Sequence, residues 1–183
     1  MVLKPDDDRP HPGVADEGWL ETWGFELASA DGVQGMVRLT RVPEIRRCWF
    51  WTQIVGRELG IVVVRDEDVA PPKRDDSLDL RGDGLWASLT CETPFEHWSV
   101  SLEAFGLRVD TRDDDLGERI PVGLDLEWEF AKEATPVDVA DGTRYTQAGV
   151  IHGEIIIDDD RIEYEGPCVR DHAWGRIALP IWS

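Results

Sequence analysis

The sequence predicts an all-β protein in which about ten antiparallel strands close into a barrel or a sandwich. Apolar and polar residues alternate along most of the chain, and turn-forming pairs such as Asp31-Gly32 and Asp141-Gly142 separate the alternating segments. No stretch of a dozen residues shows a 3.6-residue period. An open sheet of this size would expose unpaired strand edges, so we expect it to close or fold over itself.

The clearest strand lies at residues 124–130, where Leu124, Leu126, Trp128 and Phe130 alternate with acidic residues. A period of two places these four side chains on one buried face. The same alternation marks the other candidates, and signals such as Gly166-Pro167 predict turns between them. In chain order, the expected strands are residues 19–27, 35–42, 48–55, 60–65, 85–91, 97–103, 124–130, 147–157, 161–165 and 168–177.

The length of 183 residues favours a single domain with a sizeable core. We expect residues 1–18 to form a frayed or loosely packed N-terminal arm and residues 19–183 to form the single β-domain. The nine tryptophans predict either an aromatic-lined interior cavity or an ordinary large core. The sequence leaves these two alternatives open.

The net charge of −19 argues against nucleic acids and anionic membrane surfaces as partners, because both require a basic face. No segment approaches the roughly 20 apolar residues of a membrane span, and the N-terminus lacks the apolar region of a secretory signal. Three widely spaced cysteines do not suggest a disulfide framework. We therefore expect a reduced, cytoplasmic protein, with acidic runs such as Asp6-Asp7-Asp8 in solvated loops.

Residues 170–176 (Arg-Asp-His-Ala-Trp-Gly-Arg) form the densest group of side chains able to move protons or hold a polar ligand. If this segment is extended, Arg170, His172, Trp174 and Arg176 share one face. Asp171 lies on the opposite face and needs a charged partner, for which Arg144 and Arg38 are the candidates. The first face then resembles the polar floor of a cavity, with His172 as a base or donor near neutral pH.

Two further groups are candidates for ligand contacts. His152 and Glu154 share a face of the predicted strand 147–157 and, together with His172, could form a metal site, although a structural role is the simpler interpretation. Trp49 and Trp51 share a face of strand 48–55 and could either line an apolar pocket or fill the core. On balance, the sequence predicts neither a bound metal nor a cofactor.

The segment at residues 166–176 (Gly-Pro-Cys-Val-Arg-Asp-His-Ala-Trp-Gly-Arg) resembles the G-x-x-x-R-D-H-S-W-G-x-R signature of the AttH-like and carotenoid-hydratase-like (hydroxyneurosporene synthase) superfamily. Residues 94–98, 126–130 and 144–147 also resemble members of that family. The resemblance implies a lipocalin-like β-barrel. Family members usually carry two such barrels in tandem, and the resemblance implies that this chain corresponds to the first. Ala173 departs from the signature, because a serine is common there.

The resemblance also implies an activity: addition of water to an isoprenoid double bond, or cyclisation of a polyene or polyketide chain. The resemblance implies that Asp171 or His172 transfers the proton, that Trp174 lines the pocket, and that Arg170 and Arg176 orient the ligand. Protonation of an alkene requires a positioned acid in a dry pocket, with aromatic faces to stabilise the carbocation.

We therefore expect a cofactor-free hydratase or cyclase-type lyase that acts on a small apolar, isoprenoid- or polyketide-like ligand. The alternative is a non-catalytic lipocalin-like binder of small apolar molecules, or a half-protein that needs a homodimeric partner or a partner chain with the second barrel. A bulge near Gly175 would be required to bring Asp171 and His172 together.

Overall fold

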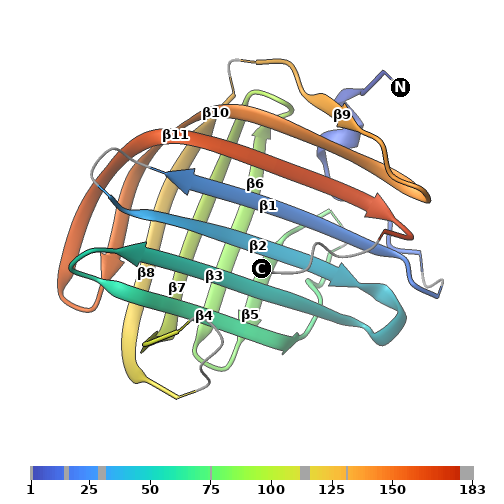
Figure 1. Ribbon diagram of the computed structural model, residues 1–183. Coiled ribbons are helices and arrows are strands. Elements are labelled where there is room, and N and C mark those ends of the chain that lie inside the picture. Colours follow the sequence, from blue (N-terminus) through green and yellow to red (C-terminus); the bar gives the residue numbers. More distant parts are fainter. Residues whose placement is uncertain are drawn as a thin grey trace.

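The computed structural model describes residues 2–14, 17–28, 32–74, 76–111, 116–130 and 132–177. Within these ranges the chain forms eleven strands of one antiparallel sheet and two short 3₁₀ turns (Figure 1). The 3₁₀ turns are η1 (Pro5–Asp8) and η2 (Pro43–Ile45). The strands are β1 (Leu20–Ala28), β2 (Gln34–Val42), β3 (Arg47–Gly56), β4 (Gly60–Val69), β5 (Asp79–Gly82), β6 (Leu85–Thr93), β7 (His97–Val109), β8 (Glu118–Glu129), β9 (Thr135–Val137), β10 (Gly142–Ile157) and β11 (Asp160–Gly175).

Eight of these strands close into a ring, which confirms the predicted fold class. The order runs β4-β3-β2-β1-β11-β10-β8-β7, and β4 then pairs with β7 to complete the circle. Strands β6 and β5 extend the sheet beyond β7, and β9 pairs with the start of β10. Closure hides the edges of the ring strands, as the sequence argument requires.

The interior is a packed core. Trp23, Trp98 and Trp128 are wholly buried, and the ring of Phe25 lies against both Trp98 and Trp128, with centroids 5.7 Å and 4.9 Å away. Trp128 points inward from β8, as the alternation at residues 124–130 predicts. Of the two alternatives for the tryptophans, these three therefore serve an ordinary large core.

Strand β11 differs from the prediction, because the two expected strands at 161–165 and 168–177 are one continuous strand. Gly166 and Pro167 are not a turn, since they pair with Ile151 and Val150 of β10 without a break in register. On the other side of β11, the pairing with β1 ends at Leu27 opposite Cys168. Pro167 therefore lies where one side of the strand has become an edge, and proline is tolerated there.

The N-terminal arm differs from its prediction more strongly than β11 does. Instead of being loosely packed, residues 2–14 include a wholly buried side chain, Asp8, and lie across one end of the barrel. Asp8 contacts β7, β10 and β11, and His11 contacts β1. Figure 1 places the N-terminus beside β9, next to the start of β10. The arm therefore closes the end of the barrel at which β1 and β10 begin.

No helix in the part of the chain that the structure describes is long and apolar enough to cross a bilayer. Cys48, Cys91 and Cys168 are all free thiols, and burial raises the pKa of Cys91 and of Cys168 to about 12.

Candidate functional site

A buried group of polar side chains surrounds His172 at the arm end of the barrel. His172 is wholly buried, and its Nε2 lies 3.1 Å from Oε1 of Glu21, which is wholly buried on β1. The same Glu21 oxygen lies 2.7 Å from Nδ1 of His11 on the arm. Arg41 of β2 reaches the other carboxylate oxygen at 3.4 Å. Three strands and the arm thus meet at one carboxylate.

The other ring nitrogen of His172 extends the group toward the arm. Nδ1 of His172 lies 3.0 Å from the hydroxyl of Tyr145 on β10. The same hydroxyl lies 2.5 Å from Oδ1 of Asp8, which forms a 2.6 Å ion pair with Arg170 of β11. Both Asp8 and Arg170 are wholly buried. We call the four linked residues Glu21, His172, Tyr145 and Asp8 the proton chain.

Additional hydrogen bonds hold Asp8 and Arg170 in place. The second carboxylate oxygen of Asp8 accepts hydrogen bonds from the backbone N–H of Phe95 at 2.5 Å and from Nε1 of Trp98 at 3.1 Å. Arg170 donates a 2.7 Å hydrogen bond to Gln147. A buried carboxylate is costly unless it is paired and hydrogen-bonded, and Asp8 meets both conditions.

The proton chain has three contacts but only two protons when its imidazole is neutral. The phenol of Tyr145 carries one proton, neutral His172 carries one, and ionised Glu21 and Asp8 carry none. Each of the three contacts requires a proton between its atoms. One additional proton is needed to fill all three, so one contact joins two acceptors when the imidazole is neutral.

The pKa values within the chain have identifiable causes. Burial lowers the pKa of His172, and the neighbouring Glu21 opposes that effect. Burial alone would raise the pKa of Glu21, but hydrogen bonds from His11 and His172 outweigh it and leave this pKa below its usual value. Burial raises the pKa of Tyr145 well above its usual value, so the phenol keeps its proton. At neutral pH the imidazole is therefore the neutral member and the acceptor of an additional proton.

Aromatic rings enclose this group. Trp23 stacks on His172 with centroids 4.9 Å apart, and Trp174 lies 4.9 Å from His172 on another side. The imidazole of His11 stacks on Trp174 at 4.2 Å. The imidazole of His172 is thus fully packed while the arm is in place. Four surface cavities, of about 590, 270, 280 and 340 Å³, are lined by other residues.

The signature residues do not all reach this site. Arg170 and His172 point into the barrel and Trp174 contacts His11, as the predicted shared face requires. Arg176 is exposed and lines a different, outer cavity. The strand ends at Gly175, whose φ of +117° breaks the alternation, and a Cβ there would approach the Cα of Gly142 to 2.6 Å.

Asp171 and His172 remain on opposite faces of β11. The register of β11 with β10 is continuous from Gly175 to the hairpin turn, so no bulge brings the two side chains together. Asp171 instead forms a 2.6 Å ion pair with Arg144, one of its two predicted partners, and lines the outer cavity of about 280 Å³. Electrostatic attraction to Asp171 also acts on Arg38, the other predicted partner.

The remaining predicted ligand residues lie elsewhere on the barrel. His152 is exposed on the outer face of β10, and Glu154 forms a 2.7 Å ion pair with Arg161. The structure therefore does not bring His152 and Glu154 to His172. Trp49 and Trp51 are half-buried on the outer face of β3, with Arg65 over the ring of Trp51 at 6.0 Å, so they belong to neither the core nor an interior pocket wall.

His11, Glu21 and His172 present ligand atoms within 4.8 Å of one another, a spacing that would suit a metal ion. However, the guanidinium of Arg41 lies at the Glu21 carboxylate, and both imidazoles already contact the carboxylate oxygen. A divalent cation there would meet a buried positive charge and displace two hydrogen bonds. We therefore treat the three residues as a hydrogen-bonded group.

Sequence reasoning missed Asp8, His11, Glu21 and Tyr145. Glu21 has a visible signal, because it occupies the inward register of β1 together with Trp23 and Phe25, where a charged residue requires a buried partner. Tyr145 lies in the segment 144–147 that carries part of the family resemblance. Asp8 gives no local signal, since it ends an acidic run that is typical of solvated loops.

The closed ring of eight strands, with a polar centre at one end, defines a lipocalin-like β-barrel protein. The solved structures include one with this fold: a protein from Nitrosomonas europaea named "putative AttH" matches at a TM-score of 0.61 and 11% identity. The match covers 98% of this chain and 57% of that one, so the chain spans little more than half of that protein's length. The AttH-like fold predicted from the signature is confirmed.

The family is shown by sequence as well. The chain belongs to the family described as Domain of unknown function (DUF7064), whose model matches residues 4–177. No curated protein matches the sequence.

Proposed function

We propose that this protein is a cofactor-free acid–base catalyst, a hydratase or cyclase-type lyase that acts on an apolar isoprenoid- or polyketide-like substrate. The observation that carries this proposal is the proton chain, with its three contacts and two protons. A group that exchanges one proton inside a dry, aromatic shell has the properties that alkene protonation requires.

In the proposed hydration, protonated His172 gives its Nε2 proton to one alkene carbon, and the π electron pair forms the new C–H bond. The adjacent carbon becomes a carbocation, which the faces of Trp23 and Trp174 stabilise. A water oxygen then bonds to this carbon. The proton that the water loses returns to neutral His172, so the net reaction adds water across the double bond.

The arm governs access in this proposal. His11 stacks on Trp174 and contacts Glu21, so the substrate reaches His172 only when His11 moves aside while Asp8 stays bound to Tyr145 and Arg170. Asp171 and Arg144, on the outer face of the barrel, take no part in the chemical step. Arg170 acts as a positioning residue by holding Asp8.

The experiment is deuterium incorporation from D₂O into 2-methylhept-2-ene, with farnesol as a longer isoprenoid probe. Hydration of 2-methylhept-2-ene yields 2-methylheptan-2-ol with one C–D bond at C3, which mass spectrometry detects. We expect labelled alcohol from the native chain, a loss of roughly 100-fold or more in His172→Gln, and unchanged labelling in the control His152→Gln. Circular dichroism verifies that each variant folds.

The absence of label from both alkenes, or equal labelling in His172→Gln, would overturn the proposal. The second candidate function is a non-catalytic binder of small apolar molecules; the apolar side chains that line the surface cavity of about 590 Å³ support it, because the interior itself is packed. The third candidate is a half-protein that needs a homodimeric partner or a partner chain with the second barrel. Native mass spectrometry detects it, because either complex has a larger mass than the single 20.7 kDa chain.

A further inference from the structure

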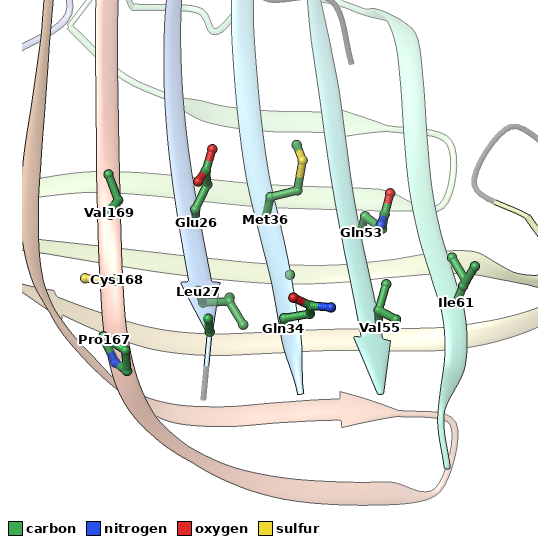
Figure 2. A pocket seen from close by; sticks show the side chains of 12 residues that line it. Glu26, Leu27, Gln34, Met36, Gln53, Val55, Ile61, Pro167, Cys168 and Val169 are labelled. Carbon is green, nitrogen blue, oxygen red and sulfur yellow. The ribbon is translucent and has the colours of Figure 1, made fainter. Parts of the chain in front are cut away.

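A groove of about 590 Å³ crosses the outer face of the barrel at the end opposite the arm. Figure 2 shows its labelled side chains, which come from five neighbouring strands, β11, β1, β2, β3 and β4. Strand β1 connects the two sites, since Glu21 near its start belongs to the proton chain and Glu26 near its end lines the groove. The two sites share no residue.

Strand register fixes the floor of the groove. Val169, Glu26, Met36 and Gln53 lie opposite one another on successive strands and form one continuous row (Figure 2). A second row beside it contains Gln34 and Val55, which pair with each other, and Ile61 opposite Val55. Because side chains alternate across a strand, the members of each row point to the same face.

The composition of the groove points to one kind of ligand. Its apolar side chains include Met36, Val55, Ile61 and Val169, and Val169 is 42% exposed although it is a large aliphatic residue on a strand. Among the described residues that line the groove, Glu26 carries the sole formal charge, and it is negative. The chain as a whole has a net charge of −19. The surroundings therefore repel an anionic ligand and attract a cationic one.

Two amides complete the polar part of the groove. Gln34 and Gln53 flank the apolar floor on β2 and β3, and their carbonyl oxygens can accept hydrogen bonds from an ammonium group. Burial lowers the pKa of Arg38, and the charges of Asp171 and, less strongly, of Glu26 raise it, so Glu26 and Asp171 share this guanidinium. A volume of about 590 Å³ lies within the range of small-molecule sites.

We propose that the groove binds a single small amphiphile with an alkyl chain and a primary ammonium group. The alkyl chain lies along Met36, Val55, Ile61 and Val169, and the ammonium group pairs with Glu26 and donates to Gln34 or Gln53. The occupant is a soluble monomer and not a membrane surface, because anionic lipid headgroups would repel the carboxylate of Glu26.

The test uses three probes with the same chain: octylammonium, octan-1-ol and octanoate, at concentrations at which each is monomeric. Titration calorimetry measures affinity, and two-dimensional NMR of backbone amides locates the site. We expect octylammonium to bind most tightly and octanoate least tightly, with shifts confined to the two rows of the groove.

Paired variants separate charge from shape. Glu26→Gln should weaken octylammonium binding by about two- to fivefold, the size expected for a solvent-exposed ion pair, and leave octan-1-ol binding unchanged. The matched control is Glu103→Gln, an exposed carboxylate on the outer face of β7. Met36→Lys should weaken both octylammonium and octan-1-ol because it removes apolar contact, and it should weaken octylammonium by about tenfold or more because it also adds a like charge.

Equal affinity for octanoate and octylammonium, NMR shifts outside the groove, or binding that begins only when octylammonium forms micelles would each overturn the proposal. The outcome of this binding test is independent of the alkene experiment, because His172→Gln leaves the groove intact and Glu26→Gln leaves the proton chain intact.

Discussion

The hydroxyl of Tyr145 lies 2.5 Å from Oδ1 of Asp8, although 137 positions separate the two residues in the sequence. This contact ties the N-terminal arm to β10 inside the barrel. It also links the ion pair of Asp8 and Arg170 to the imidazole of His172. The arm is therefore part of the folded structure and of the buried polar centre.

Asp8→Asn should lower the free energy of unfolding by about 3–5 kcal/mol, because it leaves the buried charge of Arg170 without its counter-ion. The matched control is Asp6→Asn, an exposed member of the same acidic run, which should change stability by less than about 0.5 kcal/mol. Urea denaturation measures both. Equal effects in the two variants would show that the arm does not hold Asp8 inside the barrel.

Asp8 and Tyr145 should be energetically coupled. Tyr145→Phe removes the hydroxyl that joins Asp8 to His172 and should cost about 1–3 kcal/mol, because buried hydrogen-bonding groups lose a partner. A double-mutant cycle with Asp8→Asn should yield a coupling energy of about 0.5–3 kcal/mol. Additive effects would contradict the direct contact.

His172 should make stability depend on pH. Its pKa in the folded protein is lowered by burial, so the unfolded chain binds a proton at a higher pH than the folded chain does. The contribution is fully present above the unfolded pKa of about 6.5, declines as pH falls below it, and levels off once the folded imidazole is also protonated.

This dependence is measured as the difference in unfolding free energy between the native chain and His172→Gln at several pH values between about 7.5 and about 4.5, a range that brackets the ordinary histidine pKa. The subtraction removes the contributions of the titrating groups that lie away from His172. Glu21, Tyr145, Asp8, His11 and Arg170 face His172 or its partners, and Glu21 does not cancel, because the hydrogen bond from His172 is one cause of its lowered pKa. A difference that grows as pH falls would contradict the sign of the shift.

Trp128→Ala should cost about 3–5 kcal/mol, because Trp128 is wholly buried and packs edge-on against Phe25. Trp51→Ala, a half-buried tryptophan on the outer face of β3, should cost clearly less. Melting temperature and denaturant midpoint measure the pair. A smaller loss for Trp128 than for Trp51 would reverse the assignment of inner and outer faces.

The fold could be predicted from the sequence because its signals are local. Period-two alternation at residues 124–130 placed Trp128 correctly in the core, and one residue of slip would have turned its side chain outward. The continuity of β11 could not be predicted, because Pro167 is tolerated only where the neighbouring β1 has ended. That information belongs to the pairing of two distant strands.

The site could be predicted only in part, for a related reason. The signature pointed to His172, Arg170 and Trp174, which the structure brings together. It could not point to Asp8, because an aspartate in an acidic run shows its buried position only through partners on β7, β10 and β11. It grouped Asp171 with His172 because they are adjacent in sequence, although adjacent strand residues face opposite ways.

The ring of strands has one short junction. Strands β10 and β11 share sixteen residue pairs, whereas β4 and β7 share three, Ile61 with Val109, Val62 with Arg108 and Val63 with Leu107. Thermal fluctuations should therefore separate β4 from β7 before they separate any other pair of ring strands. While these strands are apart, their two unpaired edges can bind other molecules. The part of β4 beyond the junction carries Arg65, Asp66, Glu67 and Asp68. Their charges, and the mutual repulsion of chains with a net charge of −19, protect an opened barrel against aggregation.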